Sequence, residues 1–504
     1  MKLATLMDRA GLAAAEEADV TVTGFAIDHR KVAPGTVFGA FKGARFNAED
    51  FIPAAIEAGA AAVISSPEAV VEGALHIVSE QPRQTFAQLA AEFFTPVPAH
   101  IVAVTGTNGK TSTVEMTRQI WRMCGEPAAS IGTLGVTTPD GSVATGLTTP
   151  DIVTFLSNMS GLSREGVTHV AYEASSHGLS QYRNEGLSVA AGAFTNFSRD
   201  HLDYHGTMEE YFLAKMRLFD EVVIDGGAAV IWDLAEPCEW TIRAIEHAHR
   251  RGLKLLIVGD AGGRHDVFLR LVSREATQLG QVLTLEYAGE QREVNLPLIG
   301  AYQASNALVS AGLALATGAS PSQVFDAIGR LQPVRGRLER ACLTPTGAPV
   351  YVDYAHTPDA LEAAIAALLP HVDHSSTARL ITVFGAGGDR DPGKRASMGA
   401  VAAKASDLVI VTDDNPRSEE PAAIRNAVLS GAVGADHVSD IEGRREAIAA
   451  AIRAAGANDI ILIAGKGHEQ GQIIGSGENM RILPFDDVEV ARECAAELAQ
   501  GAAL

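Results

Sequence analysis

Short apolar runs separated by polar and glycine-rich turns are the main pattern of this chain. Such runs occur at residues 61–64, 101–104, 169–172 and 191–197, and alanine-rich segments that read as helices lie between some of them. A buried strand typically reads as four to eight apolar residues bounded by turn residues. The alternation therefore predicts an α/β chain with mostly parallel sheets and helices on both faces.

Two breaks interrupt this pattern. Residues 94–98 hold two prolines close together, which is typical of a linker, and a second break falls at residues 331–336. A chain of 504 residues is too long for one compact core. We therefore predict three domains: a small N-terminal α/β domain (1–97), a central P-loop ATPase-like domain with a parallel sheet (98–331) and a C-terminal Rossmann-like α/β domain (332–504).

Three apolar runs of the predicted C-terminal domain, at residues 380–384, 408–411 and 460–463, each end in a polar, charged or glycine-rich turn. In open α/β sheets, ligands bind beyond the carboxyl ends of the strands. These three turns are therefore the expected place for a site. Two helices are also expected, one over residues 113–123 and a surface helix over residues 490–504.

The composition narrows the class of partner. The formal net charge is −21, so nucleic acid is not expected as the main partner, although local basic residues and backbone amides can still hold an anionic substrate. The four cysteines have no metal-binding or redox spacing. We find no signal peptide and no apolar stretch of about 18 residues, which predicts a cytoplasmic chain without a membrane span.

A phosphate-binding loop follows the strand predicted at 101–104, where residues 106–111 read Gly-Thr-Asn-Gly-Lys-Thr. Val104 stands where the full P-loop has its first glycine, so this is a shortened variant. The two glycines let backbone amides point at phosphate oxygens beside a helix N-terminus, and an ordinary glycine turn is the alternative. The lysine would neutralise the β/γ-phosphates, and the threonine or the next serine could ligate Mg²⁺. The predicted ATP site is Gly106, Thr107, Asn108, Gly109, Lys110, Thr111 and Ser112.

Three polar clusters follow in the predicted central domain. They are Glu-Ala-Ser-Ser-His-Gly (173–178), Asn-Phe-Ser-Arg-Asp-His-Leu-Asp-Tyr-His (196–205) and Tyr-Phe-Leu-Ala-Lys (211–215). A hard cation such as Mg²⁺ prefers oxygen ligands, and Glu173 supplies a carboxylate at the end of a predicted strand. His201 is a less usual ligand of Mg²⁺. Each residue alone could be an ordinary polar residue at a domain edge, but the clusters together are far more specific.

With the phosphate loop, these clusters make the chain resemble the Mur ligases, the ATP-dependent amino-acid ligases of peptidoglycan synthesis. The resemblance runs from about residue 24 to about residue 490. It implies that Lys215 is carbamylated, which turns a cation into an oxygen-bearing anion able to hold Mg²⁺; a surface ammonium is the alternative. The implied catalytic residues are Lys110, Glu173, His201 and Lys215, the implied metal ligands are Thr111, Glu173, His201 and Lys215, and the implied further ATP contacts are Asn306 and Arg337.

The resemblance also implies a site for a UDP-N-acetylmuramoyl dipeptide. His29 stands where the family often has serine, and residues 44–46 stand where a His-Gln-Ala type of triplet is common, so these contacts would rely on backbone atoms. The implied contacts are Ile27, His29, Ala44, Arg45, Phe46, Leu147, Thr148, Thr149, Ser175, Gln181 and Arg183.

Asp-Asn-Pro-Arg at residues 414–417 resembles the branch of the family that adds meso-2,6-diaminopimelate. An arginine-plus-acid pocket suits a zwitterion, because guanidinium groups pair with carboxylates and acidic side chains pair with ammonium groups. A buried arginine without its carboxylate partner should reject lysine strongly. The alternative is that Arg417 caps a turn or pairs with Glu419. The implied contacts are Arg390, Asp414, Asn415, Pro416, Arg417, Gly465 and Glu469.

The implied reaction is amide formation through an acyl phosphate, with His356 or His205 as the base that deprotonates the attacking amine. We expect a monomer in which the C-terminal domain closes around small-molecule substrates. A folylpolyglutamate synthase-like ligase is the nearest rival, and residues 148–150 and 414–417 speak against it. A non-catalytic nucleotide-binding protein is the other rival, and the presence of Glu173, His201 and Lys215 speaks against that.

Overall fold

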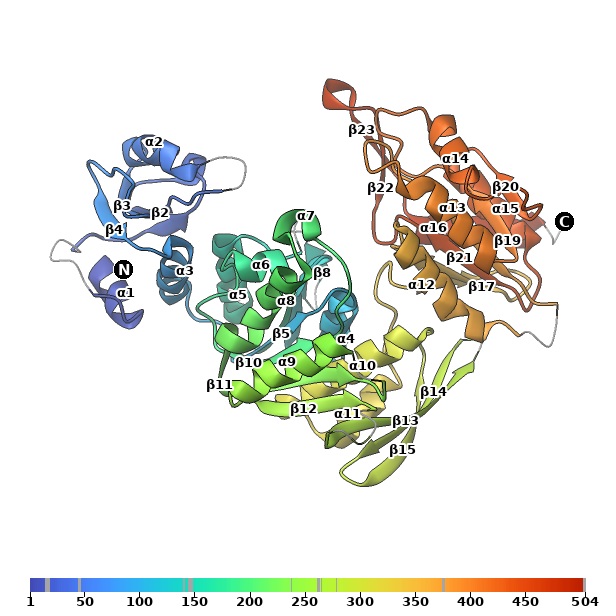
Figure 1. Ribbon diagram of the computed structural model, residues 1–504, viewed down its shortest axis with the longest axis horizontal. Coiled ribbons are helices and arrows are strands. Elements are labelled where there is room, and N and C mark those ends of the chain that lie inside the picture. The colour runs from blue at the N-terminus through green and yellow to red at the C-terminus, as the bar shows by residue number, and fades with distance from the viewer. Residues whose placement is uncertain are drawn as a thin grey trace. The chain divides into compact units, whose positions relative to one another are not determined.

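The computed structural model describes residues 1–13, 19–43, 47–138, 141–143, 148–236, 238–260, 263, 265–277, 279–373 and 377–501 (Figure 1). The chain forms two compact units, Met1–Arg270 with Leu308–Val324, and Leu271–Ala307 with Phe325–Leu504. None of the helices in the described ranges is long and apolar enough to cross a membrane.

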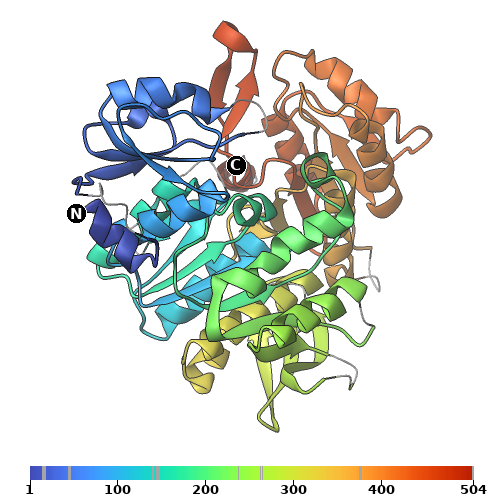
Figure 2. The same ribbon diagram turned by 60° about the vertical axis from the view of Figure 1, so that its left-hand side comes forward.

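The first unit begins with a four-stranded parallel sheet in the order β1-β2-β3-β4. Helices α1 and α3 lie on one face of the sheet and α2 lies on the other (Figures 1 and 2). Side chains of the sheet alternate between two cores, because Val37 and Ile64 pack with α1 and α3, whereas Phe38 and Val63 pack with α2. The elements are α1 (Leu3–Arg9), β1 (Gly24–Ala26), η1 (His29–Lys31), β2 (Thr36–Gly39), η2 (Ala48–Phe51), α2 (Ile52–Glu57), β3 (Ala60–Ser65), β4 (Leu75–Val78) and α3 (Pro82–Phe93).

A larger, mostly parallel sheet follows in the same unit, with strands in the order β12-β11-β10-β5-β9-β6-β7-β8. Strand β5 lies at its centre, and Ile101 and Ala103 share a buried core with Phe155 and Met159 of α5. The elements are β5 (His100–Thr105), α4 (Lys110–Met123), β6 (Ala128–Gly132), β7 (Gly135–Thr138), β8 (Gly141–Val143), α5 (Ile152–Arg164), β9 (His169–Glu173), α6 (Ser176–Ser180), β10 (Val189–Phe194), α7 (Leu202–His205), α8 (Met208–Arg217), η3 (Leu218–Val222), β11 (Val223–Asp233), α9 (Glu239–Arg250) and β12 (Lys254–Gly259).

Three elements run across the division between the units: β13 (Val267–Thr277), α10 (Ala301–Ala316) and α11 (Pro321–Ile328). The first part of β13 pairs in parallel with β12. In the second unit, β14 (Gly280–Tyr287) and β15 (Glu290–Leu296) pair as an antiparallel hairpin.

The second unit is built on a six-stranded sheet in the order β16-β17-β21-β18-β19-β20, parallel except at β16. Leu380 and Leu462 face a core shared with α12 and α13, and Ile381 and Ile461 face one shared with α15 and α16. The elements are β16 (Glu339–Leu343), β17 (Pro349–Asp353), α12 (Pro358–Leu368), η4 (Leu369–His371), β18 (Leu380–Phe384), α13 (Lys394–Ala405), β19 (Leu408–Val411), α14 (Pro421–Leu429), β20 (Val438–Asp440), α15 (Arg444–Ala454), β21 (Ile460–Ala464), β22 (Gly471–Ile474), η5 (Gly477–Asn479), β23 (Arg481–Pro484) and α16 (Asp487–Gly501).

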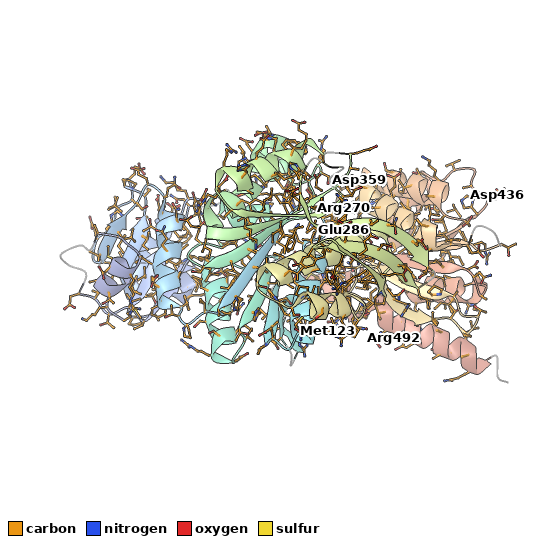
Figure 3. The ribbon with its side chains drawn as sticks, turned by 90° about the horizontal axis from the view of Figure 1, so that it is seen from below. Met123, Arg270, Glu286, Asp359, Asp436 and Arg492 are labelled. Carbon is orange, nitrogen blue, oxygen red and sulfur yellow. The ribbon has the colours of Figure 1, made fainter. Side chains whose placement is uncertain are left out.

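The predicted α/β class with three mostly parallel sheets is confirmed, and so are the strands expected at 380–384 and 408–411. Two helices differ from expectation. Helix α4 begins at Lys110, three residues early, because Gly109 in the left-handed conformation (φ 85°) serves as its N-cap. Helix α16 begins at Asp487, buries one face and carries Arg492, which is labelled in Figure 3. Arg492 Nε donates to the Ala341 carbonyl of β16 (3.1 Å).

The described part of the chain does not decide the predicted domain boundaries. Residues 94–98 do form the connection between α3 and β5, yet the first compact unit extends across them. The division between the two units runs through β13, α10 and α11 rather than through residues 331–336. The boundaries at 97 and 331 therefore stay predictions.

Candidate functional site

The phosphate loop connects β5 to α4 and is held by the neighbouring strand end. The Asn108 amide donates to Asn196 Oδ1 (2.9 Å), and Thr195 Oγ1 donates to the Asn108 carbonyl (2.6 Å). Gly106 adopts φ 142°, and a Cβ at this position would collide with Thr195 Oγ1. Glycine is thus required here by both the backbone and the packing, as in a loop shaped for phosphate.

Two lysines meet at the carbonyl of Gly106. Lys110 Nζ donates to it (2.9 Å) and to the Thr107 carbonyl (2.8 Å), and Lys215 Nζ donates to it as well (2.8 Å). Lys215 is 1% exposed and lies over the ring of Tyr211 at 4.5 Å. Burial, reinforced by the charge of Lys110, lowers the pKa of Lys215 well below its usual range. The predicted pair of catalytic lysines therefore meets at the phosphate loop, with Lys110 at the start of α4 and Lys215 on α8.

Glu173 ends β9, the strand paired with β5 opposite Val104. Its carboxylate is buried and accepts the Thr133 amide (2.7 Å). His201 precedes α7 in the left-handed conformation (φ 51°), which is uncommon for histidine and is typical of functional positions. Its Nε2 lies 3.4 Å from Asp200 Oδ2.

Several rings surround His201. His177 lies 4.9 Å from it, and Tyr211 lies 6.0 Å from it, measured between centroids. Burial, with smaller contributions from His177 and Lys215, lowers the pKa of His205 to about 4. These rings and the buried Lys215 lie close together, and Lys215 joins them to the phosphate loop through the Gly106 carbonyl.

The donor set fits a hard cation only in part. Within the described ranges, no three His, Cys, Asp or Glu side chains are grouped as metal ligands. Glu173, His201 and the Thr111 hydroxyl would need further oxygen atoms, from a bound phosphate or from a modified lysine. A protonated Lys215 would repel the cation, whereas a carbamate on its buried amine would supply the oxygen.

Four of the predicted dipeptide contacts form one hydrogen-bonded cluster. Thr149 Oγ1 lies 2.9 Å from Ser175 Oγ and donates to the Glu173 carbonyl (2.8 Å). Arg183 donates to the Thr149 carbonyl (2.9 Å) and to Gln181 Oε1 (2.6 Å). The cluster thus joins the predicted substrate residues to the strand that carries Glu173.

The remaining members of this predicted site are more scattered. Thr148 is connected to the cluster through Thr133, because the hydroxyl oxygens of the two threonines lie 3.1 Å apart. His29 begins η1, and its ring stacks on Phe51 at 4.4 Å, while Ile27 packs against the core of the first unit. The predicted contacts Ala44, Arg45, Phe46 and Leu147 lie outside the described residues.

Asn306 and Arg337, the predicted further ATP contacts, are joined through one side chain of the second unit. Gln303 Nε2 donates to the Arg337 carbonyl (2.8 Å), and Asn306 Nδ2 donates to Gln303 Oε1 (3.1 Å). The Arg337 guanidinium lies over the ring of Tyr354 at 5.2 Å. The two predicted residues are therefore neighbours, although 31 positions separate them in the chain.

The three C-terminal turns meet at one edge of the sheet, because β18 lies between β21 and β19 and all three strands are parallel. The Gly388 amide donates to the Asn415 carbonyl (2.9 Å). Gly465 has φ 121°, and a Cβ there would lie 2.6 Å from Asp414 Oδ2. The residues predicted for the amino acid are thus brought together.

Arg417 adopts the left-handed backbone conformation (φ 51°), which is uncommon for a residue other than glycine. Its Nη1 donates to the Gly388 carbonyl (2.7 Å), so part of the turn-capping alternative holds. The other part does not, because Glu419 pairs with Arg395 (2.8 Å). Among the described residues, no carboxylate lies within 4.0 Å of the Arg417 guanidinium or of Arg390.

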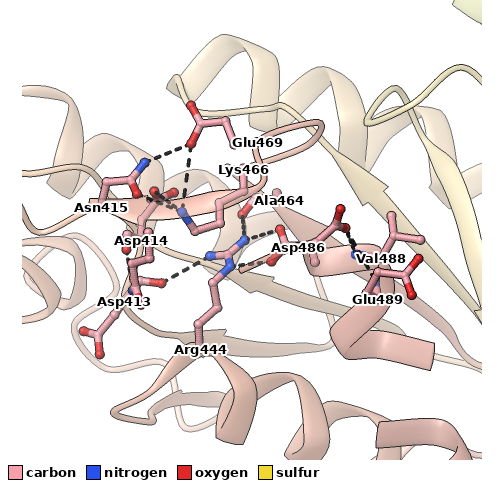
Figure 4. Close-up of polar contacts among 12 residues, drawn as sticks. Asp413, Asp414, Asn415, Arg444, Ala464, Lys466, Glu469, Asp486, Val488 and Glu489 are labelled. Carbon is pink, nitrogen blue, oxygen red and sulfur yellow. Dashed lines mark hydrogen bonds and ion pairs between the residues drawn. The ribbon is translucent and has the colours of Figure 1, made fainter. Parts of the chain in front are cut away.

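The sequence interpretation missed the residues that hold these turns. Lys466 is fully buried and donates to Asn415 Oδ1 (2.8 Å), and Asn415 Nδ2 donates to Glu469 Oε2 (2.9 Å; Figure 4). The β22–β23 hairpin also holds the turn, because its Ile473 carbonyl accepts a hydrogen bond from the Arg417 amide (3.1 Å). The sequence could have pointed to Lys466, because a lysine between two glycines directly after a buried strand is unusual. No feature of the sequence indicated the hairpin.

Comparisons with known proteins agree with this geometry. The chain matches a Mur ligase family, catalytic domain model at residues 21–94, a Mur ligase middle domain model at 104–314 and a Mur ligase, glutamate ligase domain model at 336–467. A UDP-N-acetylmuramoyl-L-alanyl-D-glutamate–2,6-diaminopimelate ligase from Zymomonas mobilis is 58% identical over 98% of both chains. The ligase of the same name from Bradyrhizobium diazoefficiens is 47% identical over 97% of this chain and 98% of its own.

Solved structures give the same picture. A UDP-N-acetylmuramoyl-L-alanyl-D-glutamate–2,6-diaminopimelate ligase structure is 31% identical and superposes with a TM-score of 0.75 over 99% of both chains. MurF from Acinetobacter baumannii superposes with a TM-score of 0.60 over 99% of both chains at 18% identity, which shows a shared fold alone.

Proposed function

Because the chain belongs to the Mur ligase family, we propose that it joins meso-2,6-diaminopimelate to the D-glutamate of UDP-N-acetylmuramoyl-L-alanyl-D-glutamate. The reaction would consume ATP with Mg²⁺ and serve peptidoglycan precursor synthesis in the cytoplasm. The proposed enzyme acts as a monomer on small molecules. The two relatives described above carry the name of this reaction, and the arrangement of the C-terminal turns supports the choice of amino acid.

The observation that carries the choice of amino acid is the charge pattern at these turns. Arg390 and Arg417 offer guanidinium groups with no carboxylate partner among the described residues, and Asp414 and Glu469 lie on the adjoining turns. Guanidinium groups select carboxylates, and carboxylates select ammonium groups. Two guanidinium groups match the two carboxylates of meso-diaminopimelate and the acidic side chains match an ammonium, whereas lysine would leave a guanidinium without a partner.

The first chemical step is phosphoryl transfer. The γ-carboxylate of D-glutamate attacks the γ-phosphorus of ATP, the bond from that phosphorus to the bridging oxygen breaks, and ADP leaves. Lys110 lies in the loop that would hold the phosphates and would neutralise the charge that accumulates on them. Amides of the loop, fixed by Asn196 and Thr195, would orient the transferred group.

The second step forms the amide. The amine of diaminopimelate attacks the acyl carbon, the tetrahedral intermediate loses inorganic phosphate, and the amine gives up its proton. We infer that His356 receives this proton rather than His205. The pKa of His205 is about 4, too low for an efficient base at neutral pH. Desolvation lowers the pKa of His356 too, but the Tyr354 carbonyl, Asp414 and Glu469 oppose that effect, and the influence of these two carboxylates supports a position near the amino acid.

Lys215 is the proposed site of carbamylation. Only a neutral amine can attack carbon dioxide, and the buried position of Lys215 favours the neutral form. The N–C bond forms, a proton is lost, and the product is an oxygen-bearing anion. Glu173, His201, Thr111 and this carbamate would then hold Mg²⁺, which would supply positive charge for the phosphoryl transfer.

The proposal predicts that inorganic phosphate is released from ATP only when the UDP-N-acetylmuramoyl dipeptide is also present. Release should require meso-diaminopimelate for repeated turnover, because the acyl phosphate otherwise has no acceptor. Leaving out each substrate in turn, in a coupled phosphate assay, tests this. Equal phosphate release without the dipeptide would contradict the proposal and would indicate a simple ATPase.

A further inference from the structure

The buried side chain of Lys466 lies at the amino-acid turns and contacts Asp414, Asn415 and Glu469 there. Its Nζ donates to Asn415 Oδ1 (2.8 Å) and to the Gly471 carbonyl (2.8 Å). Asp414 Oδ1 lies 3.8 Å and Glu469 Oε2 lies 3.9 Å from the same nitrogen (Figure 4). One cation therefore stands between two carboxylates that belong to different turns.

This placement has an electrostatic consequence. Two carboxylates at one site repel each other, and a cation that lies between them offsets this repulsion. Lys466 has no exposed surface, so its charge is poorly screened by solvent. Lys466 lies within 4 Å of both Asp414 and Glu469 and holds the two carboxylates at one site, which is the arrangement that a substrate ammonium requires.

Lys466 also fixes the shape of the turn that carries Arg417. Asn415 Oδ1 accepts from Lys466 and from the Ile473 amide (2.9 Å), and its Nδ2 donates to Glu469. The amide group thus has a partner on both ends. Through these bonds, Asn415 connects the turn after β19 to the turn after β21 and to strand β22. Arg417 lies two residues further along the chain.

Taking these contacts together, we propose that Lys466 is a positioning residue that determines amino-acid specificity by holding Asp414 and Glu469 together as the receptor for the non-reacting ammonium of the substrate. This inference rests on the proposed function. It adds a residue outside the predicted contact set, and it assigns the carboxylate pair to one end of the diaminopimelate molecule.

Two variants and one control test the role of the charge. Lys466→Gln keeps a hydrogen-bond donor and removes the charge, and Lys466→Met removes both. Lys404→Met, on the exposed face of α13, is the matched control. We expect the KM for meso-diaminopimelate to rise about 10- to 100-fold in both Lys466 variants, the loss of one or two charge-assisted hydrogen bonds. The KM values for ATP and for the UDP-dipeptide should stay within about twofold of wild type.

A substrate analogue separates positioning from a general structural effect. 2-Aminopimelate has the same carbon chain and both carboxylates as diaminopimelate but lacks one ammonium. If Lys466 acts through the receptor for that ammonium, wild type and Lys466→Gln should use 2-aminopimelate with KM values within about threefold of each other. If Lys466 had a merely structural role, Lys466→Gln would raise the KM for meso-diaminopimelate and the KM for 2-aminopimelate by equal factors. That result would overturn the inference.

The outcomes distinguish this inference from the proposed function. If wild-type enzyme does not incorporate diaminopimelate at all, the proposed function fails. If wild type incorporates it and Lys466→Gln shows the wild-type KM, only the role of Lys466 fails. Thermal unfolding of each variant checks the fold, and if Lys466→Met unfolds below the assay temperature, Lys466→Gln alone decides.

Discussion

The adjacent residues Arg444 and Arg445 offer a matched test of the buried charge network under the amino-acid site. Arg444 and Asp487 both have no exposed surface, and Arg444 Nε lies 2.7 Å from Asp487 Oδ1. Arg445 is 37% exposed and pairs with Glu493 and Glu497, which are 59% and 66% exposed. We expect Arg444→Met to destabilise the second unit strongly and Arg445→Met to have little effect.

The magnitude follows from burial. Burial alone would lower the pKa of Arg444, but the ion pair with Asp487 outweighs it and raises that pKa. Arg444→Met leaves Asp487 as an unpaired charge in the core, which costs about 3–5 kcal/mol. Arg444 Nη2 also donates to the Ala464 carbonyl (3.0 Å) at the end of β21 (Figure 4). Arg444→Met should therefore destabilise the end of β21 that leads into the amino-acid turns. The exposed pair of Arg445 contributes about 0–1 kcal/mol.

Hydrogen exchange measured by mass spectrometry is the suitable assay, because a chain of two units has no single unfolding transition. Peptides that cover β21 should exchange roughly 100- to 4,000-fold faster in Arg444→Met, the equivalent of about 3–5 kcal/mol. The same peptides should change less than about fivefold in Arg445→Met.

A double variant completes the design. Arg444→Met with Asp487→Leu removes both charges, and a buried pair replaced by apolar residues is often no less stable than the original. Exchange should therefore slow again relative to the single variant. Equal exchange rates in Arg444→Met and Arg445→Met would refute the reasoning that the buried pair governs this part of the fold.

Three further predictions concern the first unit. Lys215→Ala should lose most activity and regain part of it when short carboxylates are added, as judged by phosphate release; full activity without additive would contradict the carbamate. Gly106→Ala should abolish ATP binding measured by calorimetry, because the new Cβ collides with Thr195 and strains a backbone at φ 142°. Neutral His205 contributes stability above pH 6.5 that is lost as the pH falls toward 4, so His205→Asn should flatten the acid side of the Tm–pH curve; an unchanged curve would argue against that burial effect.

Sequence patterns were sufficient for the parallel strands and for the turns that follow them. Each of these strands is a continuous apolar run, and the turn residues Gly465 and Arg417 are bounded by such runs. Parallel pairing then brings turns together from positions far apart in the chain. The phosphate loop could be predicted because its two glycines and its lysine all lie within residues 106–110.

Contacts between residues that lie far apart in the chain could not be predicted from the sequence. Lys466 depends on Asn415, which lies 51 positions earlier, and Arg444 depends on Asp487, which lies 43 positions later. Even where the sequence around a charged residue is unusual, as at Lys466, it does not name the partner that the residue meets, because tertiary packing supplies that partner. Helix α16 is a surface helix as expected, with Arg492 and Glu493 exposed and Ala491 and Cys494 buried on the opposite face, and only its start at Asp487 was missed.

The identity of the amino acid that is joined is the central claim, and a competition assay tests it most directly. Wild-type enzyme would receive ATP, the UDP-N-acetylmuramoyl dipeptide and equal concentrations of meso-diaminopimelate and L-lysine, and mass spectrometry would identify the product. The account predicts the diaminopimelate product in excess by a factor on the order of 10⁴, and an excess that falls steeply in Arg417→Leu. Comparable amounts of the lysine product from the wild-type enzyme would contradict it.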